Sequence, residues 1–122
     1  MELEQTLATL ELEQLAARYR SYVDDGTCTA EDGLASALVE WLATGDQPAR
    51  EVRRLAELLG APWGMMRRIK ALLGIESYRK AGAWFWHFPP PEDDDELTFR
   101  NIVWRAVRGD WLEERRRYRQ ER

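Results

Sequence analysis

Apolar residues recur at intervals of three and four from the N-terminus to Gly74, which is the spacing of helices that bury one face. The first such helix is predicted from Glu2 to about Asp25, where good helix formers run without glycine or proline. Its apolar residues lie on one face in the first turns and on a neighbouring face in the later turns. The sequence therefore predicts either a break near Thr9 or frayed first turns.

A second helix is predicted to begin after Thr29, whose side chain can cap the helix while Asp32 favours its first turn. Gly45 is expected to end this helix. Its apolar residues indicate one buried face, which consists of Leu34, Leu38, Trp41 and Leu42.

Two further helices are predicted on either side of Gly60, with almost no loop between them. Pro48 suits the first turn of the earlier helix, and Pro62 lies near the first position of the later one, which runs to Gly74. Their apolar stripes are Val52, Leu55, Ala56 and Leu59, and then Met65, Met66, Ile69 and Leu72 or Leu73. Two helices joined at a single glycine must turn sharply against each other.

Beyond Ile75 the period changes to that of β-strands. Aromatic-rich extended stretches at 78–80 and 84–88 are separated only by the small residues 81–83, which predicts a β-hairpin with a short tip. Both faces of the second strand are bulky. We expect one face to pack on the core, and the final helix or a partner chain to cover the other.

The C-terminal part begins with three prolines at 89–91 and an acidic stretch at 92–96 that cannot be core. A final helical region is predicted from about Thr98, with an apolar face made of Phe99, Ile102, Val103, Ala106 and Val107. Gly109 and Asp110 are expected to interrupt it before an Arg-rich end, with Asp110 resembling a helix cap.

The charge is unevenly distributed along the chain. The protein has 122 residues and a formal net charge of -4, a length that suits one folded unit with extensions. Residues 1–48 hold ten acids and two bases, whereas residues 49–88 hold eight bases and three acids. An anionic partner is therefore expected to meet the middle segment.

Several classes of protein are disfavoured by the sequence. No run of about 18 apolar residues can span a bilayer, and Met1 opens onto acidic residues instead of a signal sequence, so a cytoplasmic location is expected. Cys28 stands alone, which excludes an internal disulfide. We interpret His87 as a satisfied strand histidine and the acids at 93–95 as a solvated linker. Neither an enzyme, nor a metal site, nor a cofactor is expected.

Four positions of the middle segment have the spacing of a known motif. Ala56 provides a small residue, Gly60 follows four positions later, and Met66 and Ile69 follow at six and nine positions beyond that glycine. This arrangement resembles the helix-turn-helix family of DNA-binding proteins. In that family the small residue allows a close helix crossing, the glycine makes the turn, and the later apolar residues anchor the second helix.

The stretch from Arg67 to Pro89 extends the resemblance, and it reads RRIKALLGIESYRKAGAWFWHFP. It is similar to the winged modules at the C-termini of some phage and plasmid replication ATPases and primase-associated proteins. There a basic helix ends in Leu-Gly, a basic strand follows, and an aromatic strand with alternating tryptophans closes before a proline. This chain has no GxxxxGK[ST] phosphate loop, so nucleotide hydrolysis is not implied.

The resemblance implies a mostly α-helical fold built on a winged helix-turn-helix with one β-hairpin wing and with added N-terminal and C-terminal helices. The predicted division is an acidic helical region at 1–47, the winged helix-turn-helix at 48–89, an acidic Pro-rich linker at 90–96, and a helical region with an Arg-rich tail at 97–122. The N-terminal helices are expected to provide a surface for a homodimer or a protein partner.

Candidate DNA contacts lie on the second helix of the motif and on the hairpin. Three basic residues of the helix avoid its apolar stripe, so they can enter a major groove, where Arg pairs with guanine and Lys meets phosphate. Two more precede the hairpin tip, where a wing follows the DNA backbone. The tryptophan that opens the helix can stack on DNA or plug the core. The predicted set is Trp63, Arg67, Arg68, Lys70, Arg79 and Lys80.

Two hypotheses of different classes follow. The first is a small protein that binds duplex DNA, as a transcriptional regulator or as an accessory of phage or plasmid replication. The alternative is an acidic, phage-encoded protein that uses a helix-turn-helix scaffold to bind and block a host enzyme. The basic middle segment favours the first, and the acidic residues 1–48 favour the second. On either hypothesis, the basic helical triplet can also be an ordinary solvated helix face.

Overall fold

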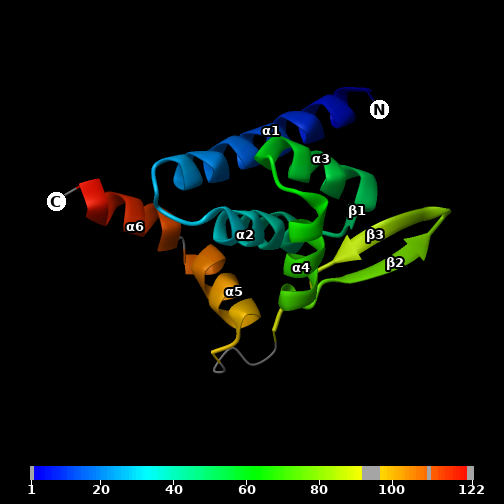
Figure 1. Ribbon diagram of the computed structural model, residues 1–122. Helices are drawn as coiled ribbons and strands as arrows, with labels where there is room; N and C mark the ends of the chain where they lie inside the picture. Colours follow the sequence, from blue (N-terminus) through cyan, green and yellow to red (C-terminus); the bar gives the residue numbers. More distant parts are fainter. Residues whose placement is uncertain (1, 92–96, 110, 121–122) are drawn as a thin grey trace.

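The computed structural model describes residues 2–91, 97–109 and 111–120 (Figure 1). Its elements in chain order are α1 (Glu2–Asp24), α2 (Ala30–Ala43), β1 (Gln47–Pro48), α3 (Ala49–Leu59), α4 (Trp63–Leu73), β2 (Glu76–Lys80), β3 (Ala83–His87), α5 (Phe99–Gly109) and α6 (Trp111–Gln120). The acids of the predicted linker at 92–96, the cap at Asp110 and the last two residues of the Arg-rich tail lie outside the described residues.

The middle of the chain has the layout of a winged helix-turn-helix. A helix (α2), a short strand (β1), two helices (α3 and α4) and a hairpin (β2 and β3) follow one another, and the strands form an antiparallel sheet in the order β1-β3-β2. The hairpin extends away from the helices (Figure 1). The predicted fold class is confirmed.

Strand β1 is an addition that the sequence did not predict. Gln47 and Pro48 pair with Trp86 and Phe85 of β3, so they hold the root of the hairpin against the helices. Pro48 has extended backbone angles (φ -62°, ψ 143°) and is the cap of α3 instead of a residue of its first turn. A proline ring fixes φ at a value that both an extended residue and a helical residue adopt, so the residue type did not distinguish the two positions.

Residues with positive φ make the sharp turns. Gly60, at φ 67°, ends α3 and permits the abrupt turn into α4. At the hairpin tip, Ala81 (φ 52°) and Gly82 (φ 80°) form a two-residue turn in which both φ angles are positive, which matches the twist of the strands that it joins. The tip is therefore shorter than predicted, and the strands start at Glu76 and Ala83.

Helix α1 runs from Glu2 to Asp24, so the predicted break near Thr9 is wrong. The change of apolar face reflects a change of surroundings. Leu12 and Tyr19 are buried against the body of the molecule, whereas Leu10 is 47% exposed. Helix α1 is continuous in Figure 1 and runs alongside α3, which contacts it.

The main core cluster draws on every helix from α1 to α5 and on β3, and a smaller one consists of Tyr19, Tyr22 and Ala37. Leu12, Leu38, Val52, Ile69 and Val103 are buried members of the main cluster. Helix α2 passes through the centre, since every residue from 33 to 39 is buried. A helix buried on all sides must be covered on all sides, and α1, α4 and α5 all contact it.

The final helix does not provide the predicted cover for the outer face of β3. Helix α5 packs on α2, and its Trp104 contacts Phe88 with ring centroids 5.7 Å apart. The outer face is covered within the sheet, where Tyr78 stacks on Phe85 at 5.7 Å. Cross-strand aromatic pairs stabilise a hairpin directly, so no further element is needed there. The predicted interruption at Gly109 is confirmed, because α5 ends at that residue.

Candidate nucleic-acid interface

The six residues predicted to contact DNA lie on α4 and on the hairpin, and their surroundings divide them into two groups. Three of them contact other parts of the protein, namely Trp63, Lys70 and Arg68. The other three, Arg67, Arg79 and Lys80, are exposed and form no hydrogen bond or ion pair with the residues that the structure describes.

Trp63 and Lys70 join α4 to the root of the hairpin. The ring of Trp63 lies 6.0 Å from that of Trp86 on β3. Lys70 places its Nζ 5.2 Å above the same Trp86 ring and donates a hydrogen bond of 2.9 Å to Ser77 Oγ. Both side chains therefore hold the hairpin at a defined angle to α4, and Trp63 is half-buried, as expected of a core plug.

Arg67 and Arg68 are neighbours in sequence with different surroundings. Arg68 is exposed as well, but it forms an ion pair with Glu31 of α2. Arg67 is exposed and forms neither a hydrogen bond nor an ion pair with the residues that the structure describes. It shares a side of α4 with Trp63 and Lys70, which lie four residues before and three residues after it. Arg67 therefore borders the hairpin.

Arg79 and Lys80 lie at the outer end of β2. Arg79 is opposite Trp84 and Lys80 is opposite Ala83 in the strand register, so the two charges point to opposite faces of the hairpin. Both are exposed, and neither forms a hydrogen bond or ion pair within the described ranges. The hairpin thus carries cations on both faces near its tip.

The loop before β1 fixes the hairpin from its outer face. Asp46 Oδ1 lies 2.7 Å from His87 Nδ1, and Asp46 Oδ2 accepts a hydrogen bond of 2.6 Å from the Tyr78 hydroxyl. The bond from Tyr78, followed by the contact with His87, lowers the pKa of Asp46. The interpretation of His87 as a satisfied strand histidine is confirmed. Its partner was not predicted, because Asp46 is distant in sequence.

Two residues beside the predicted set were missed. Arg53 of α3 is exposed and lies 4.9 Å above the ring of Trp63, which adds a cation at the start of α4. The sequence signal that could have identified Arg53 is its place in the basic segment 49–88. Trp84 is 53% exposed on the same face of the hairpin as Arg79. Its regular alternation with Trp86 made both residues resemble core residues.

Two arginines of α6 contact α1 and the loop after it, at the far end of the molecule from the hairpin (Figure 1). Arg115 donates to the Thr27 carbonyl at 3.2 Å, and Arg116 pairs with Asp25 at 2.9 Å while its guanidinium lies 4.2 Å above the Tyr22 ring. These contacts attach α6 to the end of α1 and to the loop after it. Arg115 and Arg116 are therefore used to hold the helix in place.

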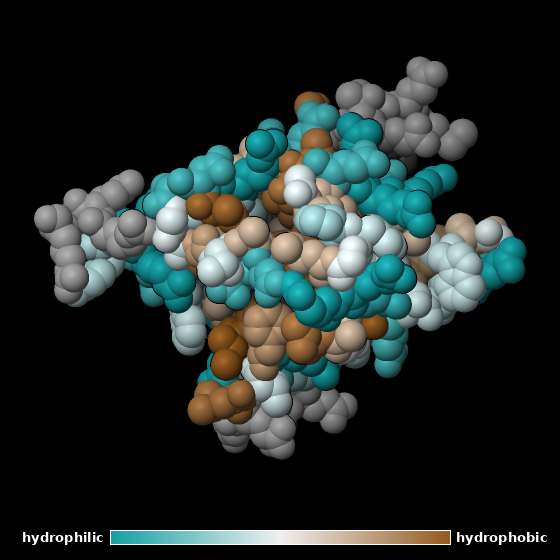
Figure 2. All heavy atoms as spheres, in the orientation of Figure 1, coloured by the Kyte–Doolittle hydropathy of each residue, from teal (hydrophilic) through white to brown (hydrophobic). Residues whose placement is uncertain are grey.

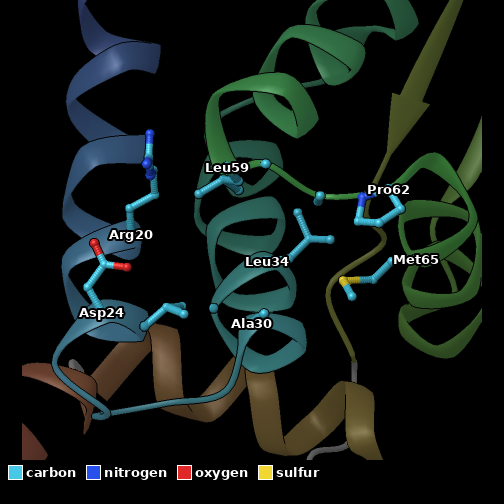
Figure 3. A pocket seen from close by; sticks show the side chains of 11 residues that line it. Arg20, Asp24, Ala30, Leu34, Leu59, Pro62 and Met65 are labelled. Atoms are coloured by element: carbon cyan, nitrogen blue, oxygen red, sulfur yellow. The ribbon is translucent and has the colours of Figure 1, made fainter.

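A pocket of about 170 Å³ lies between α1, α2 and the turn from α3 to α4 (Figure 3). Arg20 and Asp24 of α1 stand on one side of it, while Leu34, Pro62 and Met65 supply apolar lining. Among the described residues, no three His, Cys, Asp or Glu side chains are grouped so that they could hold a metal ion. No helix in those ranges is long and apolar enough to cross a membrane.

Comparison of the chain with protein-family models, with curated protein sequences and with solved structures finds no match. The fold class therefore rests on the order and pairing of the helices and strands alone. It is a winged helix-turn-helix with additional helices at both ends.

Proposed function

We propose that this protein is a non-enzymatic, cytosolic DNA-binding protein that contacts duplex DNA through α4 and the hairpin, as a transcriptional regulator or a replication accessory. One observation carries the proposal. Arg67, Arg79 and Lys80 are exposed cations on consecutive elements that form no hydrogen bond or ion pair with the residues that the structure describes, whereas Arg68, Arg115 and Arg116 are bonded to other groups.

The dimensions of the elements fit this role. The major groove of B-DNA admits one α-helix, so α4 can enter it with Arg67 directed at a base edge or a phosphate. The hairpin protrudes from the body (Figure 2), and Arg79 and Lys80 directly precede its Ala81–Gly82 turn. Cations there would meet the phosphates of the flanking backbone. The contacts of Lys70 and Asp46 hold the two elements in one orientation, so little ordering is required on binding.

The test is a titration of fluorescently labelled random-sequence duplex DNA, followed by anisotropy over a series of salt concentrations. Each neutralised phosphate contributes a slope of about -0.9 in log K against log salt, so the three cations predict a slope near -3. Absence of binding at low salt, or binding that salt does not weaken, would contradict the proposal.

Helix α1 is the proposed surface for a second copy of this chain. Leu10 is 47% exposed on α1, and an exposed apolar residue on a helix is suited to contact with a partner helix. A dimer would present two winged modules to DNA, which raises apparent affinity. Light scattering should give the mass of a dimer for the parent and of a monomer for Leu10→Glu. A monomeric parent at every concentration would remove this part of the proposal.

A further inference from the structure

Trp84 differs from the other aromatic residues of the hairpin. Tyr78 and Phe85 stack on each other with an interplanar angle of 16°, and Trp86 is buried between Trp63 and Lys70. Trp84 is 53% exposed and makes no ring or cation contact with any residue that the structure describes. A large flat ring is thus open to solvent, whereas the neighbouring aromatic rings of the hairpin stack on each other or pack against α4.

The position of Trp84 links it to the proposed DNA surface. Trp84 alternates with Trp86 along β3, so both rings lie on the hairpin face that meets α4. Trp86 lies at the root, beneath Lys70, and Trp84 lies two residues nearer the tip, opposite Arg79. The exposed ring therefore lies beside a cation that forms no hydrogen bond or ion pair with the described part of the chain.

The chemistry of this pair distinguishes paired from unpaired DNA. In a continuous duplex each base is stacked on its neighbours and offers only its edges, so an indole ring cannot stack on it. An unpaired base has a free face, and stacking on an aromatic side chain is a principal source of affinity for single strands. The positive charge of Arg79 and Lys80 complements the phosphates on either side of such a base.

We propose that Trp84 is a stacking surface for an unpaired base, so that the protein prefers a junction between duplex and single-stranded DNA to a continuous duplex. This inference rests on the proposed function and specifies its substrate. Helix α4 would hold the duplex arm, and the hairpin would hold the first unpaired nucleotides.

The test compares two labelled DNAs of the same sequence, one a blunt duplex and one with a short single-stranded overhang, by anisotropy titration. The parent should bind the overhang DNA more tightly. Trp84→Ala should weaken binding of the overhang DNA by about five- to 150-fold, the range expected for one lost stacking contact, and leave the blunt duplex unaffected. Trp84→Phe, which keeps an aromatic face, should retain most of the preference. Trp111→Ala is the matched control, because Trp111 is 46% exposed on α6.

The outcomes separate this inference from the proposal on which it rests. If the parent binds both DNAs equally and Trp84→Ala changes neither affinity, the junction inference is wrong and the duplex proposal stands. If the parent binds neither DNA, the proposed function itself fails. If Trp84→Ala weakens both DNAs alike while circular dichroism and melting match the parent, Trp84 is a general contact and the preference for unpaired bases is overturned. Should Trp84→Ala not fold, loss of the overhang preference in Trp84→Phe would overturn the inference.

Discussion

The hairpin and α6 are both rich in basic residues, yet their charges are used in opposite ways. On α6, Arg115 and Arg116 are bound to Thr27 and Asp25, so the helix is attached to the body by its own cations. On the hairpin, Arg79 and Lys80 have no such partners within the described ranges. The hairpin itself is held by a different set of contacts, at its root.

This difference shows that the ability of a surface to attract phosphate depends more on whether its cations already have partners than on how many cations it carries. The N-terminal region holds most of the excess acid of the chain, and α6 packs against the end of α1, where acids are available. The hairpin extends from the opposite end of the molecule (Figure 1). An overall charge of -4 is therefore compatible with a local surface that attracts phosphate.

The contrast between the hairpin and α6 requires first that α3 and α4 cross closely, because this crossing supports the hairpin. Ala56 is buried in the same cluster as Met66 and Ile69. Ala56→Leu should lower the free energy of unfolding by about 1–3 kcal/mol through overpacking, as measured by urea denaturation. Glu57→Leu adds the same side chain at the adjacent exposed position and should have little effect. Equal midpoints for both variants would contradict the close crossing.

The two adjacent arginines of α4 allow the same contrast to be tested within a single helix, because Arg68 forms an ion pair and Arg67 forms none with the described residues. Arg67→Ala should weaken binding to a preferred duplex site by about 1–3 kcal/mol if the lost contact is bidentate to a base. Arg68→Ala should weaken it less, because the Arg68 charge is already paired with Glu31. Titrations of both variants against the same site provide the measurement. A larger loss for Arg68→Ala would mean that the ion pair opens on binding and that the assignment is reversed.

Removal of one α6 arginine should affect structure and leave DNA binding intact. Arg116→Ala should destabilise the attachment of α6 by about 1 kcal/mol, since it removes one ion pair and one cation–π contact. Faster amide hydrogen exchange in α6, with unchanged exchange in α4, is the expected result. A loss of DNA affinity in this variant would mean that α6 takes part in DNA binding, which contradicts the proposed interface on α4 and the hairpin.

The smallest expected effect concerns pH at the hairpin root. The pKa of Asp46 is lowered in the folded protein, so its ionised form adds stability that is complete above the ordinary carboxyl range of about 4. That stability is lost as the pH falls through the folded pKa. Denaturation midpoints should therefore fall less steeply below about pH 4 in Asp46→Asn than in the parent. Identical acid profiles would show that Asp46 does not stabilise the hairpin root.

Much of the fold could be predicted from the sequence because it is encoded locally. Helices α2, α3 and α4 have regular apolar spacing, and Thr29 and Gly60 mark ends that the structure confirms. Strand β1 could not be predicted, since two residues carry no periodicity and its pairing with Trp86 joins distant parts of the chain.

The candidate site was only partly predictable for the same reason. Sequence distinguishes basic residues from an apolar stripe, so it selected both Arg67 and Arg68. It does not reveal that Glu31, on a different helix, lies beside only one of them. The exposure of Trp84 likewise depends on where α3 and α4 end relative to the hairpin, which is set by tertiary packing.

The most direct test of the central claim is the salt dependence of duplex DNA binding in two matched double variants. Arg79→Ala with Lys80→Ala removes two hairpin cations, and Arg116→Ala with Arg117→Ala removes two from α6. The account predicts that the hairpin variant binds all sequences more weakly, with a log K against log salt slope shallower by about 2, while the α6 variant keeps the parental slope. A parental slope in the hairpin variant, or a shallower one in the α6 variant, would contradict it.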